Sequence, residues 1–503
     1  MAGSGPTAPY PGPMADSVPP ALVIVLAAGE GTRMKSALAK VLHPVLGTPL
    51  LGHVLREVGA LAPAQTVVVV GHQRERVTEY LAADFPQVRT AVQAEQLGTG
   101  HAVRCALAAL TEQGVASNPT GGTVLVTAGD TPLLTADTLA ALLAEHDATG
   151  AKATVLSAEL PDPTGYGRIL RAADGSVTGI VEHKDATQQQ RLVHEINSGV
   201  YAFDARALAE ALVRVSTDNS QGEEYLTDVL GILHGDGERI SAYVAADPED
   251  VHGINDRVQL AAAARVMASR VNEALMRTGV SIVDPATTWI APEVTVGRDA
   301  VIERNTWIGP GSSVAEGAVI GPDTTLLATS VGHGATVLRS HCDHAVIGAA
   351  ATVGPFTYLR PGADLGDKAK AGAYVEIKNA TVGVGAKVPH LSYVGDAEIG
   401  SGTNIGAATV FVNYDGVHKH RTVVGQDVRI GSDTMLVAPV TIGDGAYTGA
   451  GSVITEDVPA GTLALGRARQ RNIDGWVERV RPGSPAAEAA RQAASGPASD
   501  TAE

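Results

Sequence analysis

The chain has 503 residues and a formal net charge of −17, from 37 Lys and Arg against 54 Asp and Glu. This negative field repels polyanions, and an aromatic content of 4% leaves few platforms for stacking bases, so nucleic-acid binding is disfavoured. Two cysteines exclude a disulfide framework and favour a reducing, cytoplasmic location, and no apolar run reaches the ~18 residues of a membrane span.

Both ends of the chain have the composition of disordered segments. Residues 1–20 are rich in Pro, Ala, Gly and Ser, and they lack the basic and apolar regions of a signal peptide. Residues 482–503 have the same small, polar character. We therefore expect a disordered N-terminal lead over 1–20 and a disordered tail over 482–503.

Between residues 21 and 256, short apolar runs alternate with helical patterns. Leu22–Leu26, Thr66–Val70 and Thr123–Thr127 have the length of buried strands, and Pro49–Leu61 has helical spacing. This alternation predicts a Rossmann-like α/β domain with a mainly parallel sheet. Ligands of such sheets bind beyond the carboxyl ends of the strands, where two of these runs are followed by Gly-rich segments.

A single helical pattern follows the α/β region. Residues 257–279 are rich in Ala, Leu, Arg and Met, which are strong helix formers, and they end at Gly279, a suitable C-terminal cap. We expect a linker helix there.

Residues 280–481 carry a different period, since apolar residues recur every six positions. Such hexapeptide repeats are typical of a parallel β-helix, here expected to be left-handed, whereas a β-sandwich would need the spacing by accident. The repeat alone does not establish an enzyme, because such a solenoid can serve only for assembly. The repeated positions are Ile290, Val296, Ile302, Ile308, Val314, Ile320 and Leu326, then Ile347, Val353, Leu359, Leu365 and Ala371, and then Val424, Ile430, Leu436 and Ile442.

A Gly-rich loop follows the first expected strand, over residues 26–34. It lacks the Gly-Lys-Ser/Thr of a Walker A loop, and Met34 replaces the small residue of a dinucleotide fingerprint. Its glycines let backbone N–H groups approach phosphates, and Arg33 and Lys40 add positive charge. The loop fits a triphosphate cradle, although a structural turn explains it about equally well.

Two further segments suit nucleotide chemistry. Residues 93–100 offer amides, a hydroxyl and bare backbone, which suit the reading of a base edge. Asp130 follows the third strand, where its carboxylate suits Mg²⁺, although a lone Asp after a strand is more often a turn or capping residue.

Taken together, these motifs resemble those of a known family. Residues 26–34 with Lys40-Val41-Leu42 resemble the opening motif of sugar-nucleotide pyrophosphorylases. Residues 93–100, 165–168 and 182–185 narrow the resemblance to the bifunctional bacterial N-acetylglucosamine-1-phosphate uridyltransferase/glucosamine-1-phosphate acetyltransferase family. It covers about residues 21–476, and one departure is Ala39, where a Pro is commoner before the Lys.

For the region 21–256, the resemblance implies uridylyl transfer from UTP to N-acetylglucosamine 1-phosphate with release of pyrophosphate. It implies Mg²⁺ as cofactor, with Asp130 and Asn255 as its ligands. The residues that it places in the UTP and UDP-sugar site are Leu26, Ala27, Ala28, Gly29, Arg33, Lys40, Gln93, Gly98, Thr99, Gly167, Glu182, Asn197 and Asn255.

In the β-helix region, interruptions of the repeat carry the chemistry. Residues 412–420 break the six-residue spacing and predict a loop outside the coil, a common place for a binding site. A lone His on a solenoid is more often a surface residue. As part of a group of cationic and polar residues, however, His390 becomes a candidate general base. The other members of the group are Arg360, Lys378, Tyr393 and Asn404.

The resemblance implies that this region transfers an acetyl group from acetyl-CoA to glucosamine 1-phosphate, with His390 as the base. His418 and His420 are rival histidines, but their place in the loop favours solvent-exposed roles. The implied glucosamine-phosphate residues are Arg360, Lys378, Tyr393 and Asn404, and the implied acetyl-CoA residues are Ala407, Asn413, Tyr414, Ser432, Ala450 and Arg467.

The leading interpretation is a homotrimer that carries both activities and acts on small molecules. One alternative is a uridyltransferase whose β-helix only trimerises. Another is a sugar-nucleotide sensor with an inactive pyrophosphorylase domain, which the presence of Asp130 and Lys40 argues against.

Overall fold

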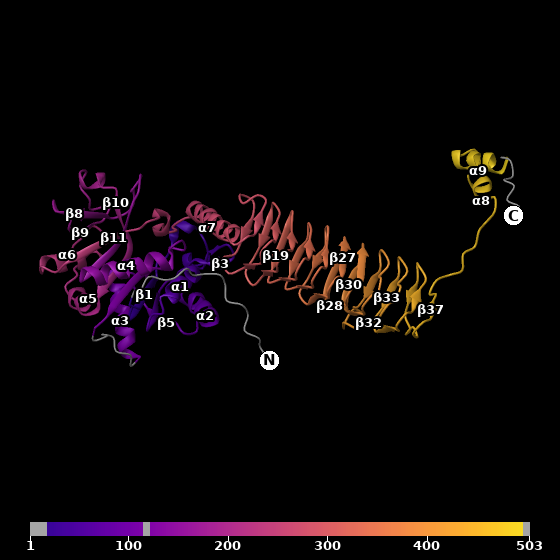
Figure 1. Ribbon diagram of the computed structural model, residues 1–503, viewed down its shortest axis with the longest axis horizontal. Helices are drawn as coiled ribbons and strands as arrows, with labels where there is room; N and C mark the ends of the chain where they lie inside the picture. Colours follow the sequence, from indigo (N-terminus) through magenta and orange to yellow (C-terminus); the bar gives the residue numbers. More distant parts are fainter. Residues whose placement is uncertain (1–17, 114–120, 496–503) are drawn as a thin grey trace.

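The computed structural model describes residues 18–113 and 121–495, arranged as Figure 1 shows. An α/β domain lies at one end, one long helix follows it, and a stack of short strands forms the elongated remainder. Most of the predicted N-terminal lead, residues 1–17, and the last eight residues, 496–503, lie outside the described residues.

The α/β domain is built on one mixed sheet. Its strands are β1 (Leu22–Ala27), β4 (Thr66–Val70), β5 (Arg89–Val92), β6 (Thr123–Ala128), β7 (Ala153–Glu159), β8 (Arg168–Arg171), β9 (Val177–Val181), β10 (Glu195–Asp204) and β11 (Ile240–Val244). They run in the order β11-β7-β10-β6-β1-β4-β5, with β8 and β9 as a ribbon beside β10. β1 is parallel to β4 and β6, whereas β10 is antiparallel to β6 and β7. A buried strand has the same apolar pattern in either direction, so the sequence did not reveal that β10 is reversed.

Helices cover both faces of this sheet. They are α1 (Leu50–Ala60), α2 (Arg74–Asp84), α3 (Thr99–Glu112), α4 (Ala136–Thr149), α5 (Ala205–Leu212) and α6 (Asp228–Gly235). Alternate side chains of β1 point to opposite layers: Val23 and Val25 lie in the core with α1, α2 and α4, whereas Leu22 and Ile24 lie in the core with α3, α5 and α6. Short connecting elements are η1 (Thr32–Met34), η2 (Lys40–Leu42), β2 (Pro44–Val45), β3 (Thr48–Pro49), η3 (Gln190–Leu192) and η4 (Pro248–Val251).

The long helix α7 (Arg257–Arg277) joins the α/β domain to the solenoid. Its N-cap, Asp256, accepts hydrogen bonds from the backbone N–H groups of Val258 and Gln259, both at 2.9 Å. Beyond its C-terminal end, Gly279 has φ +100°, a conformation that favours glycine.

Helix α7 is anchored to the first coil of the solenoid through a buried amide. The Nδ2 of Asn272, a fully buried residue, donates to the carbonyls of Pro285 at 3.1 Å and Thr288 at 2.9 Å. Met267 and Val271 of the same helix belong to an apolar core that is continuous with the solenoid interior. Helix α7 and the solenoid therefore share one continuous apolar core.

The solenoid is a parallel β-helix with three sides to a coil. Trp289 pairs with Trp307 and Tyr358 pairs with Glu376, each 18 residues along the chain. Eighteen residues are three hexapeptides, which confirms the predicted repeat and the expected left-handed β-helix class.

One side of the β-helix contains β12 (Ser281–Ile282), β15 (Val301–Ile302), β18 (Val319–Ile320), β21 (Thr336–Val337), β24 (Thr352–Val353), β27 (Lys370–Ala373) and β29 (Lys387–His390), and later β35 (Tyr447–Thr448) and β37 (Leu463–Ala464). The other two sides form one continuous sheet, because some strands bend across the corner between them. Its strands are β13 (Trp289–Ile290), β14 (Thr295–Val296), β16 (Thr306–Ile308), β17 (Ser313–Val314), β19 (Thr324–Leu327), β20 (Ser330–Val331), β22 (His341–Asp343), β23 (Val346–Ile347), β25 (Tyr358–Leu359), β26 (Ala363–Leu365), β28 (Glu376–Val382), β30 (Tyr393–Ile399), β31 (Val410–Val412), β32 (Thr422–Val424), β33 (Met435–Val437), β34 (Val440–Ile442) and β36 (Val453–Ile454).

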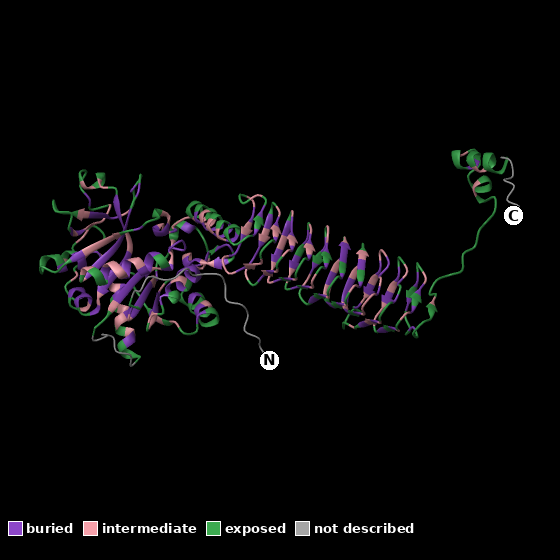
Figure 2. Ribbon diagram, in the orientation of Figure 1, coloured by how far each residue is buried: buried purple, intermediate pink, exposed green. Residues whose placement is uncertain are grey.

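The six-residue positions predicted from the sequence form the core of this β-helix. Val296 is half-buried, and the other repeated positions are buried. Figure 2 shows the buried residues in purple along the inside of the stack and exposed residues on its outer edges.

One coil is longer than the others. Val410 pairs with Met435, which lies 25 rather than 18 residues further along. The predicted loop at 412–420 accounts for the difference, and a bridge between Tyr414 and Lys419 closes it.

The C-terminal region differs from its predicted description. The last β-helix strand ends at Ala464, and two helices follow, α8 (Trp476–Val480) and α9 (Pro485–Ser495), away from the coils in Figure 1. Helix α9 lies within the segment for which composition predicted disorder. Its many alanines explain the difference, because Ala has the highest helix propensity. Among the described residues, none of the helices combines the length and apolar character needed to span a bilayer.

Candidate active sites

The first site gathers around the side chain of Lys40. Its ammonium contacts the Asp130 carboxylate and lies 3.3 Å from Oδ1 of Asn255. The side chains of Lys40 and Asp130 are 14% and 18% exposed, so the pair is largely shielded from solvent. Three of the predicted site residues, from three distant segments, therefore meet at one point.

Backbone contacts bring those segments together at the carboxyl edge of the sheet. The N–H of Gly129, just after β6, donates to the carbonyl of Leu26 at 2.8 Å, and the N–H of Ile254 donates to the carbonyl of Asp130 at 2.9 Å. Gly31 has φ +63°, and an added Cβ there would lie 2.6 Å from Cβ of Lys40. Only glycine lets the loop approach the lysine this closely.

The donor set fits a magnesium ion. One carboxylate oxygen and one amide oxygen converge on a single positive charge, and Mg²⁺ prefers such hard oxygen donors. Within residues 18–113 and 121–495, no group of three or more His, Cys, Asp or Glu side chains could hold a metal. A metal here would therefore need oxygens from a bound substrate, as phosphates can supply.

Predicted base-reading residues lie at the start of α3. Gln93 is buried, and its Nε2 donates to the carbonyl of Gly98 at 3.0 Å. Gly98 has φ +109° and packs against the backbone of Glu224, where a Cβ would clash. The hydroxyl of Thr99 accepts from the N–H of Leu226 at 2.9 Å, so part of its hydrogen-bonding capacity is used within the protein.

The predicted sugar-binding residues cluster where β8 meets β10. The N–H of Asn197 donates to the carbonyl of Gly167 at 2.9 Å. An added Cβ at Gly167 would lie 3.4 Å from both Cβ of Asn197 and Oε2 of Glu182. Burial raises the pKa of Glu182, and Tyr201 donates its hydroxyl proton to Oδ1 of Asn197 at 2.9 Å. These side chains are held in place before any ligand arrives.

Two loop residues show different environments. Arg33 is exposed and, in the described part of the chain, has no hydrogen-bond or ion-pair partner. Gly29 has no heavy atom within 4 Å of where a Cβ would be, which leaves open space beside its backbone. Ala27 and Ala28, at the end of β1, are buried.

The second site lies on the β-helix, where cations of successive coils stand side by side. Leu359 pairs with Ile377, so that Arg360 and Lys378 follow in register. Nη1 of Arg360 lies 2.7 Å from Oε1 of Glu376. The nearby Lys419 side chain, and to a smaller extent Arg360, lower the pKa of Lys378. This concentration of positive charge suits a phosphate group.

A tyrosine and an amide meet above Gly395 in the same region. An added Cβ at Gly395 would clash with the Tyr393 hydroxyl and would lie 2.7 Å from Nδ2 of Asn413. That Nδ2 donates to Oδ2 of Asp396 at 2.5 Å, and Nδ2 of Asn379 donates to Oδ1 of the same carboxylate at 2.6 Å. Tyr393 belongs to the predicted glucosamine-phosphate residues and Asn413 to the predicted acetyl-CoA residues, so these two groups of residues adjoin each other at Gly395.

Several predicted residues form a column that crosses the coils. Backbone hydrogen bonds between successive coils connect its members. The N–H of Ala408 donates to the His390 carbonyl, that of Asp433 to the Ala407 carbonyl, and that of Gly451 to the Ser432 carbonyl. At the top of the column, Cδ of Arg467 lies 3.8 Å from the place of a Cβ on Gly451. Because coils stack at roughly 4.8 Å, the column offers a track of about 19 Å for an extended ligand. Its members are His390, Ala407, Ser432, Ala450 and Arg467.

The rival histidines are placed differently from His390. His390 is exposed at the end of β29, and no described residue bonds to its ring. Nε2 of His420 instead lies 2.7 Å from the Asp415 carboxylate, within the loop. His418 is exposed, and its backbone N–H donates to the same carboxylate at 2.6 Å. Of the three histidines, His390 is therefore the one whose exposed ring has no bonding partner among the described residues.

Two predicted residues make no side-chain bond to the other predicted residues within the described chain. Asn404 is on the side of the β-helix that carries Lys387 and Arg429, and its side chain bonds to none of the other predicted residues in the described chain. Tyr414 is exposed in the loop, where its hydroxyl donates to the Gly416 carbonyl at 2.6 Å.

Sequence reasoning missed three residues of the second site: Glu376, Asp396 and Lys419. Each interacts with a residue of another coil, which is distant in the sequence: Glu376 with Arg360, Asp396 with Asn413, and Lys419 with Lys378. The signal available for Lys419 was its place in the loop that interrupts the repeat, next to residues already singled out.

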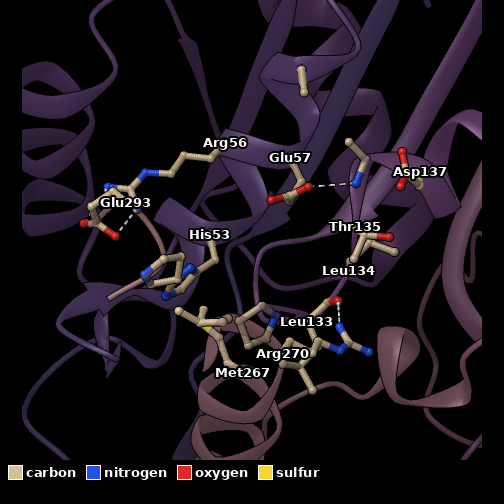
Figure 3. A pocket seen from close by; sticks show the side chains of 15 residues that line it. His53, Arg56, Glu57, Leu133, Leu134, Thr135, Asp137, Met267, Arg270 and Glu293 are labelled. Carbon is tan, nitrogen blue, oxygen red and sulfur yellow. Dashed lines mark hydrogen bonds and ion pairs between the residues drawn. The ribbon is translucent and has the colours of Figure 1, made fainter. Parts of the chain in front are cut away.

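A separate cavity of about 460 Å³ lies at the junction of the two domains (Figure 3). Arg56 and Glu57 of α1, Arg270 of α7 and Glu293 of the first coil line it, and none of the predicted site residues does. Both of its arginines are paired within the protein: Arg56 with Glu293 at 3.2 Å, and Arg270 with Asp250 at 2.7 Å.

Comparison with known proteins supports this division into two enzymatic units. The family model described as MobA-like NTP transferase domain matches residues 23–197, and the model described as bacterial transferase hexapeptide (six repeats) matches residues 421–456. The protein named "Bifunctional protein GlmU" of Streptomyces avermitilis is 59% identical over 482 residues, which are 96% of this chain and 99% of the relative.

Proteins of the same name give equally complete matches. That of Thermobifida fusca is 59% identical over 474 residues (94% of this chain, 97% of the relative), and that of Corynebacterium aurimucosum is 55% identical over 481 residues (95% and 97%). The chain belongs to the bifunctional GlmU family. It is accordingly a bifunctional enzyme, with a uridyltransferase in the first domain and an acetyltransferase in the second. The family assignment confirms the resemblance and argues against both the scaffold and the sensor alternatives.

Proposed function

We propose that the chain makes UDP-N-acetylglucosamine in two consecutive steps. The β-helix acetylates glucosamine 1-phosphate with acetyl-CoA, and the α/β domain then transfers a uridylyl group from UTP to the N-acetylglucosamine 1-phosphate formed. The convergence of Lys40, Asp130 and Asn255 carries the proposal for the α/β domain, and the register that sets Arg360 and Lys378 on neighbouring coils carries it for the β-helix.

In the acetyl transfer, the amine of glucosamine 1-phosphate attacks the thioester carbonyl carbon of acetyl-CoA. The new C–N bond forms as the C–S bond breaks, the His390 ring accepts the amine proton, and the imidazolium returns that proton to the leaving thiolate, so that coenzyme A leaves as a thiol. Arg360 and Lys378 hold the sugar phosphate, and Tyr393 and Asn404 hold the ring. A base of this kind contributes about 10²–10⁴ in rate.

Acetyl-CoA lies along the column that begins at His390. Small residues at Ala407 and Ala450 leave room for its extended arm, and the Arg467 guanidinium pairs with a phosphate at the far end. Asn413, Tyr414 and Ser432 complete the set of contacts. Asn413, which lies above Gly395 beside Tyr393, holds the thioester end of acetyl-CoA next to the glucosamine ring.

In the uridylyl transfer, the phosphate of N-acetylglucosamine 1-phosphate attacks the α-phosphorus of UTP. A new P–O bond forms while the bond to the β-phosphate breaks, and pyrophosphate leaves. Lys40 and Arg33 bind the phosphates, and Gly29 allows the backbone to approach them. Gln93, Gly98 and Thr99 read uracil, and Gly167, Glu182 and Asn197 hold the sugar.

Asp130 and Asn255 hold Mg²⁺ when the substrate is bound. The ion supplies neutralisation of the triphosphate charge and orientation of the reacting groups. Lys40 then keeps its ammonium beside the same phosphates, where it offsets further negative charge.

The proposed assembly is a homotrimer through the β-helix. Phe356 and Tyr374 are 52% and 59% exposed and stack on each other with ring centroids 5.2 Å apart, and Leu391 of the next coil is 61% exposed. Such an exposed apolar column is covered when copies of a solenoid pack together. Light scattering is expected to give three times the chain mass of 51.4 kDa.

The product is proposed to feed cell-wall polysaccharide synthesis in the cytoplasm, where the free thiols of Cys105 and Cys342 stay reduced.

The test of the function is direct. Purified protein should release coenzyme A with glucosamine 1-phosphate as acceptor, and pyrophosphate with UTP, Mg²⁺ and N-acetylglucosamine 1-phosphate. Release of pyrophosphate without release of coenzyme A would leave only the uridyltransferase.

A further inference from the structure

A chain of hydrogen-bonding groups lies beneath the base-reading segment. Nε2 of Gln93 donates to the carbonyl of Gly98 at 3.0 Å and lies 3.2 Å from Nδ1 of His101. His101 is the third residue of α3, and its Nε2 lies 3.6 Å from Sγ of Cys105, one turn further along the helix. The buried amide of Gln93 is thus held from two directions.

The carbonyl of Gly98 determines which groups donate and which accept in this series of hydrogen bonds. A carbonyl oxygen can only accept, so the amide nitrogen of Gln93 must face it. The second N–H of the same amide then faces Nδ1 of His101, which must therefore be the acceptor. This places the imidazole proton on Nε2, toward the weakly accepting sulfur of Cys105.

With both amide N–H groups engaged, the free part of the Gln93 side chain is its Oε1. In the described chain, no residue donates to this oxygen. It is consequently a fixed acceptor, held by groups that oppose its rotation. Rotation of the amide by 180° would set Oε1 against the Gly98 carbonyl, and two acceptors repel each other.

We propose that His101 is a positioning residue that locks the Gln93 amide so that it accepts from uracil and rejects cytosine. The proposal rests on the proposed function, in which this segment reads the base of UTP. Uracil presents an N3–H donor to a fixed acceptor, whereas cytosine presents an N3 lone pair, which the same oxygen repels. A site built around one fixed hydrogen bond discriminates strongly because the wrong partner leaves a buried polar group unpaired.

The test compares UTP with CTP in His101→Leu and His101→Asn. Leu removes the acceptor, so the preference for UTP over CTP in kcat/KM is expected to fall about tenfold, mainly through a higher KM for UTP. Asn offers its Oδ1 near the place of Nδ1 and should restore most of the preference. Thr111→Ala, on the same helix and bonded only to its own helix carbonyl at 3.1 Å, is the matched control.

Two results would overturn the proposal. One is an unchanged UTP to CTP ratio in His101→Leu with a native circular dichroism spectrum. The other is an Asn variant as impaired as the Leu variant, since that points to packing rather than hydrogen bonding. Calorimetric binding of UTP and CTP in the presence of Mg²⁺ reads the same preference without turnover. Failure of uridylyl transfer in the wild type is therefore distinguishable from failure of the His101 assignment.

Discussion

The Lys40 ammonium contacts the Asp130 carboxylate although 90 residues separate them in the chain. The same ammonium lies 3.3 Å from Oδ1 of Asn255, which comes from the segment before α7. A positive charge thus already lies among the oxygens proposed to hold Mg²⁺. This arrangement puts positive charge where the polyphosphate of UTP is proposed to bind.

Replacing Lys40 with Met removes the central cation of the first site. We expect uridylyl transfer to fall about 10²–10³-fold, because a positioned charge acts most strongly where transition-state charge develops. Acetyl transfer should stay within about twofold of the wild type, since Lys40 is far from the second site in the chain and the fold. Pyrophosphate release and coenzyme A release measure the two effects. Lys35→Met, an exposed residue of the same loop, is the control.

Metal removal should separate the two activities. Chelation with excess EDTA is expected to abolish pyrophosphate release and to leave coenzyme A release unchanged, because the proposed acetyl transfer uses His390 as its base and needs no metal ion. Asp130→Asn should raise the Mg²⁺ concentration needed for half-maximal uridylyl transfer about tenfold or more, since it removes a charged ligand. Equal loss of both activities on chelation would contradict the assignment.

Gly395→Ala tests the second site by steric means. The added methyl group would displace the Tyr393 hydroxyl and the Asn413 amide, which lie above the glycine. We expect acetyl transfer to fall at least tenfold while uridylyl transfer is retained, because a shift of about 1 Å in a positioning group can cost 10²-fold. The control is Gly59→Ala in α1, where an added Cβ meets nothing within 4 Å. Full acetyl transfer in Gly395→Ala would refute this geometry.

Asn272→Ala tests the junction between the domains. The change removes the donor from the carbonyls of Pro285 and Thr288, of which Thr288 is buried, and should destabilise the fold by about 1–3 kcal/mol. A lower midpoint of thermal unfolding measures this. Glu273→Ala, the next residue, breaks only an exposed pair with Arg277 and should change stability by at most about 0.5 kcal/mol.

Local patterns were sufficient to predict the architecture. The six-residue spacing around Ile290 and Leu359 predicted which residues fill the β-helix, because each coil repeats the same inward position. The runs at Thr66–Val70 and Thr123–Thr127 became β4 and β6 almost unchanged. The repeat also located the loop at 412–420, since any insertion shifts the period.

Long-range relationships were not accessible from one sequence. Strand β10 runs antiparallel to β6, and its apolar pattern is the same in either direction, so the pattern does not reveal the reversal. Lys419 and Asp396 act through residues of other coils, and His101 acts through the orientation of an amide. The helix at Pro485–Ser495 was missed because small, polar composition was given more weight than its alanines.

The central claim is that one chain carries two consecutive activities, and one measurement tests it most directly. Conversion of glucosamine 1-phosphate to UDP-N-acetylglucosamine is followed with acetyl-CoA, UTP and Mg²⁺ for Lys40→Met, for His390→Ala and for an equimolar mixture of the two. Neither variant alone should make the product at more than about 1% of the wild-type rate, whereas the mixture should, because the acetylated intermediate can pass between molecules. Product formation by either variant alone at the wild-type rate would contradict the account.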